Sequence, residues 1–270
     1  MMAGRKLIRT SDGNRGIGIE QRMGVTLLCF SSPVLSLAVL DELTSSLEAL
    51  SEKEAQSPVV LRSAHPTVFL AGAHLAEIAA LDAVSCDGYA DRGRLVVERL
   101  EEHPAPTVAA VNGSCSGGGF DLVLACDSIV AGPGASFGHP GIRRGLVTGW
   151  SGSTRLPSRL GSTTARAVLL EARELDAAAL SACAAGRQTD GDPLEAAIET
   201  ALRLASLEPV RWELWRALKG PGFIDRFQAS VVHKLLQWRI CHTSKRKEKS
   251  TLKGRSAAGN SGRERELGEP

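Results

Sequence analysis

The sequence predicts an α/β protein built around a largely parallel sheet and followed by a helical C-terminal region. In the first half of the chain, short apolar runs alternate with stretches whose apolar residues recur at three- and four-residue steps, as strands joined by crossover helices require. Beyond Arg155 the pattern becomes mainly helical. With 270 residues, of which 43% are hydrophobic and 23% charged, the chain has the composition of one main globular domain.

The first elements are expected to be a hairpin and a crossover helix. Residues 17–20 and 25–30 are strand-like and flank a turn-prone segment at 22–24. After Pro33, one apolar helical face is formed by Leu37, Leu40, Leu43, Leu47 and Leu50. Residues 58–63 then suit a buried strand, and the small residues of 69–73 indicate a loop that leads into another helix.

The centre of the chain has the order strand, glycine turn, helix. A helix over 86–102 is expected to end before the prolines at 104 and 106, because proline disfavours helical geometry in the residue before it. Residues 107–111 form a compact strand that runs into Gly117-Gly118-Gly119, and an apolar helix follows. Residues 128–132 are expected to add a further strand to the sheet.

The C-terminal half is expected to be helical over 163–171, 176–185 and 193–207. We predict a flexible N-terminus at 1–16, a core at 17–200 and a helical region at 201–243. An aromatic-rich amphipathic stretch over 212–238 favours subunit association for that last region. Residues 244–270 are rich in charge, Gly and Ser, and we expect them to form a disordered tail.

Composition excludes several classes of function. A formal net charge of +2 is too small to indicate a nucleic-acid-binding protein. The six cysteines are far apart and have no metal-site or disulfide spacing, which favours a reducing compartment. The chain shows no apolar run near the ~20 residues of a membrane span and no secretory signal, so we expect a cytoplasmic protein without a membrane span.

The glycine cluster at 117–119 is the strongest local signal for a site. Between a strand and a helix, residues without side chains let a ligand approach the backbone, and the amides of a helix N-terminus suit an oxyanion. A tight turn or close packing explains the same glycines equally well. The surrounding residues decide between these two interpretations.

Residues 106–122 resemble the central motif of the crotonase (enoyl-CoA hydratase/isomerase) superfamily. Segments 125–131, 135–140 and 145–157 are similar to those that follow it in that family. Upstream, 69–75 resembles the family's first oxyanion-hole loop, and 33–37 its early loop in contact with coenzyme A. The resemblance covers about residues 17–170, in the family's order.

This resemblance implies a ββα spiral core and an acyl-CoA substrate. The backbone amides of Ala73 and Gly118 would form an oxyanion hole around the thioester oxygen. The residues expected to contact substrate are Leu35, Leu37, Ala71, His74, Leu75 and Gly117. The family also implies a homotrimer or hexamer, with coenzyme A present only as part of the substrate and no metal or other cofactor.

The acid/base residues match the family only in part. Where family hydratases have two glutamates, this sequence has Asp121 and Gly141. Asp121 keeps a carboxylate and is the candidate catalytic residue, while Gly141 has no side chain. His139 is a possible acid/base substitute, and His74 a weaker one, because histidine titrates near neutrality. Asp127 is expected to be a structural residue.

Two other functions remain open from the sequence. The chain could be a catalytically impaired homologue that binds acyl-CoA after loss of the second carboxylate. Alternatively, residues 113–117 follow a strand and precede a helix like the nucleophile elbow of an α/β-hydrolase, with Cys115 as the nucleophile. That hydrolase would need an acid and then a histidine further along the chain.

Overall fold

The computed structural model describes residues 6–7, 16–52, 56–82 and 84–219. Contacts divide the chain into two units, 1–221 and 222–270, and every described residue belongs to the first. The predictions for most of residues 1–16, for the aromatic stretch beyond 219 and for the tail at 244–270 therefore lie outside the described residues.

The larger sheet has seven strands in the order β1-β2-β3-β5-β8-β10-β13. Their bounds are β1 Lys6–Leu7, β2 Ile17–Arg22, β3 Val25–Phe30, β5 Val59–Ser63, β8 Thr107–Val111, β10 Ser128–Ala131 and β13 Arg187–Gln188. β2 and β3 form the expected antiparallel hairpin, with Ile17 opposite Phe30. From β3 to β13 every neighbouring pair is parallel, which confirms the largely parallel sheet.

Two smaller sheets complete the spiral. One contains β6 (Val68–Leu70), β9 (Ser114–Ser116), β11 (Ser136–Gly138) and β12 (Leu175–Asp176), and the other contains β4 (Val34–Leu35) and β7 (Gly72–Ala73). β5, β8 and β10 of the large sheet are each followed by a strand of the four-stranded sheet, which gives the expected ββα spiral. The loop predicted at 69–73 instead contains β6 and β7, because its backbone pairs with distant segments.

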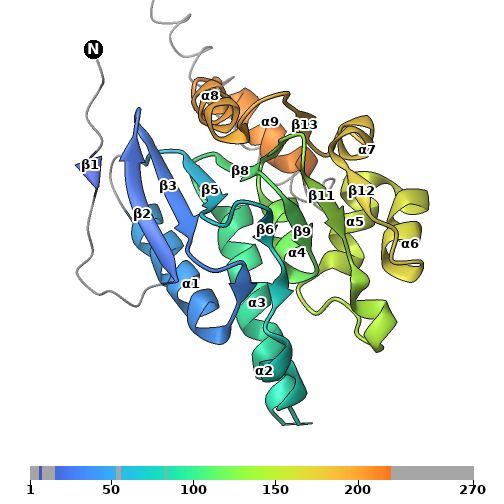
Figure 1. The fold of residues 1–270 in the computed structure, drawn as a ribbon. Coiled ribbons are helices and arrows are strands. Elements are labelled where there is room, and N and C mark those ends of the chain that lie inside the picture. Colours follow the sequence, from blue (N-terminus) through green and yellow to red (C-terminus); the bar gives the residue numbers. More distant parts are fainter. Residues whose placement is uncertain (1–5, 8–15, 53–55, 83, 220–270) are drawn as a thin grey trace, which may run out of the picture. The chain divides into compact units, whose positions relative to one another are not determined.

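Helices cover both faces of the larger sheet (Figure 1). On one face lie α1 (Leu37–Ser51), α3 (Ser85–Glu102) and α4 (Gly118–Ala125), and on the other lies α8 (Pro193–Ala205). The central strands β3, β5, β8 and β10 are largely apolar on both sides because each face is buried. In β3, for example, Leu28 and Phe30 belong to the first core, whereas Val25 and Leu27 pack under α8.

The remaining helices include the predicted ones, with small shifts, and two over residues 140–144 and 152–160 that the sequence pattern did not predict. They are α2 (Leu75–Ala79), the 3₁₀ helix η1 (Pro140–Arg144), α5 (Gly152–Leu160), α6 (Ser162–Leu170), α7 (Ala177–Ala182) and α9 (Pro209–Lys219). α7 starts later than expected because Leu175–Asp176 pairs with β11 as a strand. α8 runs through residue 200, so the boundary expected between 200 and 201 falls inside a helix.

Buried polar contacts hold the elements around α4 in place. Arg155 of α5 donates two hydrogen bonds to Glu101 of α3, with Nε–Oε1 at 2.8 Å and Nη2–Oε2 at 2.5 Å. Asp127 has the structural role expected for it, since its Oδ2 accepts from the amide of Thr107 at 2.8 Å and from its hydroxyl at 2.9 Å. These contacts fix the strand before the glycine turn and the helix after the site.

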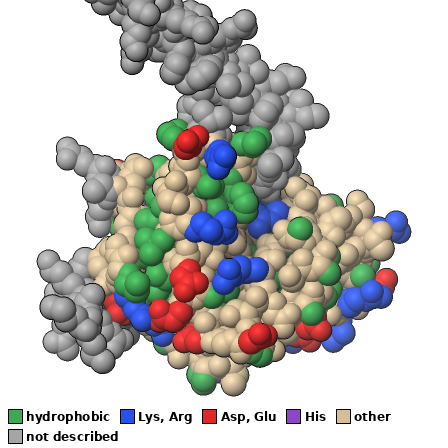
Figure 2. Space-filling view, turned by 90° about the horizontal axis from the view of Figure 1, so that it is seen from above, with side chains coloured by type: hydrophobic (Ala, Val, Ile, Leu, Met, Phe, Trp, Pro, Cys, Tyr) green, Lys and Arg blue, Asp and Glu red, His purple; other side chains and the backbone are tan. Residues whose placement is uncertain are grey.

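The surface and the helices give few signs of other functions. In Figure 2, acidic and basic side chains share the face seen from above instead of forming one basic patch. None of the helices in the described part is long and apolar enough to cross a membrane. Within the same residues, no three His, Cys, Asp or Glu side chains come together as ligands for a metal ion.

Candidate active site

A cavity of about 480 Å³ lies at the N-terminal end of α4. Its walls come from β7 and α2, from α3, and from the segment that runs through η1 to the start of α5. Segments far apart in the sequence thus meet here. Among the residues expected in the site, those that line this cavity are Ala71, Ala73, Leu75, Gly117, Gly118, Asp121 and His139.

The turn between β9 and α4 depends on Gly117 and on a second glycine, Gly72. Gly117 has φ 55° and ψ −129°, a conformation that residues with a side chain rarely adopt. A Cβ placed on Gly72 would lie 2.7 Å from the carbonyl oxygen of Ser116 and 3.1 Å from the amide nitrogen of Gly118. The backbone before Ala73 therefore passes directly against the turn. Gly118 begins α4, so its N–H has no acceptor four residues earlier within the helix.

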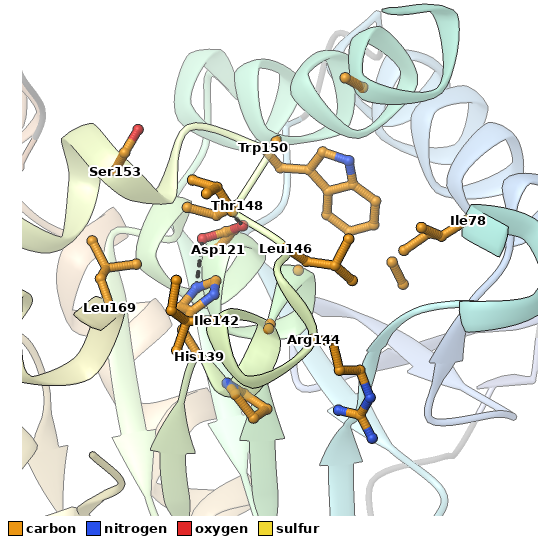
Figure 3. Close-up of a pocket in the computed structure, with 18 of the residues that line it drawn as sticks. Ile78, Asp121, His139, Ile142, Arg144, Leu146, Thr148, Trp150, Ser153 and Leu169 are labelled. Atoms are coloured by element: carbon orange, nitrogen blue, oxygen red, sulfur yellow. Dashed lines mark hydrogen bonds and ion pairs between the residues drawn. The ribbon is translucent and has the colours of Figure 1, made fainter. Parts of the chain in front are cut away.

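Asp121 is held by two polar neighbours (Figure 3). Its side chain is only 1% exposed. Oδ1 lies 3.0 Å from Nε2 of His139, and Oδ2 accepts from the hydroxyl of Thr148 at 2.5 Å. Because an ionised carboxylate only accepts hydrogen bonds, the Nε2 of His139 is the donor to Oδ1 when Asp121 is ionised. This arrangement satisfies both carboxyl oxygens and orients them.

His139 therefore has the partner that the sequence did not reveal. The residue directly follows β11, and its ring packs 6.0 Å from the ring of Phe120. Thr148, which comes from the segment between η1 and α5, was missed by sequence reasoning. That segment has no periodic pattern, and only a hydroxyl among glycines and apolar residues marked the position.

The second carboxylate of the family is absent at the cavity wall as well as in the sequence. Gly141 lies in η1 and lines the cavity, and a Cβ there would be 3.2 Å from the carbonyl oxygen of Leu146. The titratable side chains among the described lining residues are Tyr89, Asp121, His139 and Arg144. Burial, with a smaller contribution from Glu77, raises the pKa of Tyr89 to about 12 and keeps it neutral near pH 7. The Asp121–His139 pair is thus best suited to transfer protons.

Three of the residues expected to bind substrate have other positions. Leu35 has no exposed surface and belongs to the core, because β4 is covered by α1. Leu37 is half-buried against that core, and its amide donates to the carboxylate of Glu77 at 3.0 Å. His74 is the N-cap of α2, where its Nδ1 accepts from the amide of Glu77 at 3.3 Å. All three residues thus make contacts within the fold and do not line the cavity.

Cys115 cannot be the nucleophile of an α/β-hydrolase in this structure. It is the middle residue of β9, between β6 and β11, and is 1% exposed. Burial raises the pKa of its thiol well above the ordinary value, and the charge of Asp121 adds to this effect. The reactive thiolate is therefore strongly disfavoured. A strand also replaces the sharp exposed turn that a nucleophile elbow needs, so the hydrolase interpretation is wrong.

Comparison with known proteins agrees with this geometry. A family model described as enoyl-CoA hydratase/isomerase matches residues 20–204. The mouse mitochondrial methylglutaconyl-CoA hydratase is 31% identical over 161 residues, which are 58% of this chain and 51% of that protein. A probable enoyl-CoA hydratase of Mycobacterium bovis is 34% identical, over 59% of this chain and 62% of its own length. The chain thus spans about half to three fifths of these relatives.

Solved structures extend the likeness over most of the chain. An enoyl-CoA hydratase of Bacillus anthracis superposes with a TM-score of 0.73 and 27% identity, over 91% of this chain and 96% of that chain. An enoyl-CoA hydratase subunit of Geobacillus kaustophilus gives a TM-score of 0.74 at 25% identity, over 89% and 96% of the two chains.

Proposed function

Because the chain belongs to the enoyl-CoA hydratase/isomerase family, we propose that it binds an acyl-CoA thioester and stabilises an enolate formed from it. The observation that carries this proposal is the convergence of Ala73, Gly118 and Asp121 on one cavity. The close approach of Gly72 to the amide nitrogen of Gly118 supports it, because two separate main-chain segments then border the same space.

The amides of Ala73 and Gly118 are the proposed donors to the thioester oxygen. Removing a proton alpha to a thioester, or adding water to a conjugated enoyl thioester, places negative charge on that oxygen. A preorganised donor typically lowers such a barrier by about 3–4 kcal/mol. Backbone donors need no particular side chain, so these groups define a class of substrate without selecting the reaction that follows.

Asp121 is the proposed acid/base residue, with His139 as the partner that compensates for Gly141. In hydration, a water molecule gives one proton to the carboxylate, and its hydroxyl bonds to the β-carbon of the enoyl group. The electrons of the double bond move toward the thioester oxygen, and the pair returns one proton to the α-carbon. In double-bond migration, the same carboxylate removes a proton from one carbon and delivers it to another.

The proposed assembly and ligands follow the family. Coenzyme A enters as part of the substrate, and we propose no other cofactor. We also propose a homotrimer or hexamer, which exposed apolar side chains at the cavity rim support: Leu75 is 51%, Val147 75% and Leu170 63% exposed. Light scattering on the full chain tests this, and a monomer would contradict it. The cytoplasmic location remains a prediction, and the mouse methylglutaconyl-CoA hydratase is a mitochondrial protein.

The function is tested by product analysis with short and medium 2-enoyl-CoA and 3-enoyl-CoA thioesters. Mass spectrometry distinguishes addition of water from double-bond migration, which leaves the mass unchanged. We expect turnover by the wild-type chain and its loss in Asp121→Ala. Turnover that is insensitive to Asp121 would reject this residue as the acid/base group. Binding of acyl-CoA without turnover would instead indicate the impaired homologue, the alternative that Gly141 favours.

A further inference from the structure

Trp150 occupies an unusual position beside the proposed oxyanion hole. The residue lies between η1 and α5, lines the cavity and is only 3% exposed. A Cβ on Gly118, at the start of α4, would lie 2.1 Å from Cζ3 of the indole. A Cβ on Gly93, inside α3, would lie 2.0 Å from its Nε1. The indole thus fills the space between these two helices, directly against the turn that would hold the thioester oxygen.

Gly93 leaves the space that the indole needs. Glycine inside a helix is less favourable than alanine, so its presence needs a local reason. Here the reason is steric, since any side chain at this position would overlap the ring. One turn earlier in α3, Tyr89 extends the same wall, with its ring 6.2 Å from the indole. Its hydroxyl is buried and has no hydrogen-bond partner within the described part of the chain.

The opposite side of the cavity is aliphatic. Figure 3 shows the indole projecting from its loop toward Leu146 and Ile78, which face it. An acyl chain attached to a thioester carbonyl at Gly118 would therefore have the rigid indole on one side and aliphatic side chains on the other. Additional methylenes gain burial only where the walls leave room for them, and a fixed aromatic ring cannot move aside as a flexible side chain does.

We propose that Trp150 is the residue that determines acyl-chain length, by ending the pocket between α3 and α4 so that short acyl groups are preferred. This inference rests on the proposed function, because it assumes that the thioester is held at Gly118. Removing the indole would extend the pocket into the space between the two helices. Each methylene that becomes buried in the extended pocket would tighten binding by about fourfold.

Binding of saturated acyl-CoA molecules tests this without depending on turnover. Calorimetric dissociation constants would be measured for butyryl-, octanoyl- and dodecanoyl-CoA with the full chain and with Trp150→Ala. We expect the wild-type chain to prefer butyryl-CoA. In Trp150→Ala, the affinity for octanoyl-CoA relative to butyryl-CoA should rise by at least about tenfold. Trp150→Phe keeps a smaller ring and should give an intermediate ratio, and it replaces the alanine variant if that variant does not fold.

The matched control is Trp212→Phe. Trp212 packs against the core under α8, and it does not line the cavity. We expect this variant to keep the wild-type ratio of octanoyl- to butyryl-CoA affinity. An unchanged ratio in both folded Trp150 variants, with acyl-CoA still bound, would overturn the role of Trp150 and leave the proposed function intact. A wild-type chain that binds none of the three thioesters would overturn the proposed function itself, and the inference with it.

Discussion

Replacing Asp121 with asparagine separates its chemistry from its structural contacts. The two side chains have nearly the same shape, and the asparagine oxygen can still accept from Thr148, which donates to Asp121 at 2.5 Å. The amide nitrogen can donate to Nε2 of His139 if that ring changes tautomer. Both hydrogen bonds of the side chain can therefore still form, and the free energy of unfolding should change by no more than about 1.5 kcal/mol.

The effect on catalysis should be much larger, because an amide cannot take up the proton. A positioned general acid/base group contributes about 10²–10⁴-fold to the rate, which corresponds to about 2.7–5.4 kcal/mol of barrier. KM should change little, since the carboxylate is 1% exposed and its hydrogen bonds are to His139 and Thr148. The assay is steady-state kinetics on the enoyl-CoA that the wild-type chain converts, together with thermal unfolding of both proteins.

Asp127→Asn provides the matched control. Asp127 is also buried and lies just after α4, the helix that contains Asp121. It accepts hydrogen bonds from Thr107 and does not line the cavity. We expect this variant to lose about 1–3 kcal/mol of stability and to keep kcat below its unfolding temperature. Asp121→Asn with kcat within about tenfold of wild type would refute the reasoning. Equal loss of kcat in the two variants would do so as well.

Three further perturbations address the partner residue, the fold and the cavity wall. His139→Gln can still donate to Asp121 but cannot take up a proton, so kcat should fall by about 10²-fold or more; a kcat equal to wild type would exclude proton transfer through this pair. Arg155→Ala removes the partner of Glu101, a carboxylate that is only 12% exposed, so the free energy of unfolding in urea should fall by about 3–5 kcal/mol. A loss below about 1 kcal/mol would indicate that the pair behaves like a surface ion pair. Tyr89 is the one tyrosine of the chain, so absorbance titration of the phenol reports it alone. Burial raises its pKa from 10.0 to about 12, and the folded state should therefore lose stability as the pH rises above 10.0. A titration midpoint near 10.0 would contradict the burial of this side chain.

The order of the strands and helices could be predicted because it depends on local patterns. The alternation of apolar runs and helical stretches predicted β3, β5, β8 and β10, and the helices α3, α6 and α8, within one or two residues at each end. Pairing between distant segments has no local pattern. The strands at Gly72–Ala73 and Leu175–Asp176 pair with β4 and β11, which are distant in sequence, so the first was expected to be a loop and Asp176 to begin a helix.

Only those parts of the site that lie within a family motif could be predicted from the sequence. The glycine turn and Asp121 could be placed by resemblance to a family motif, and both line the cavity. The contacts of Thr148 and Trp150 depend on a segment that returns to the site from about thirty residues further along the chain, which no periodicity reveals. The same resemblance placed Leu35 and His74 in the pocket, but Leu35 lies in the core and His74 caps α2. Motifs located the backbone of the site better than its side chains.

The exchange of α-protons in a saturated acyl-CoA tests enolate formation most directly. The full chain is incubated with butyryl-CoA in D₂O, and incorporation of deuterium at the α-carbon is followed by NMR. No double bond is needed, so the result depends only on the donors to the thioester oxygen and on the residue that removes the proton. We expect exchange with the wild-type chain and loss of it in Asp121→Asn. Bound butyryl-CoA without exchange, or equal exchange in the two proteins, would contradict the role assigned to this site.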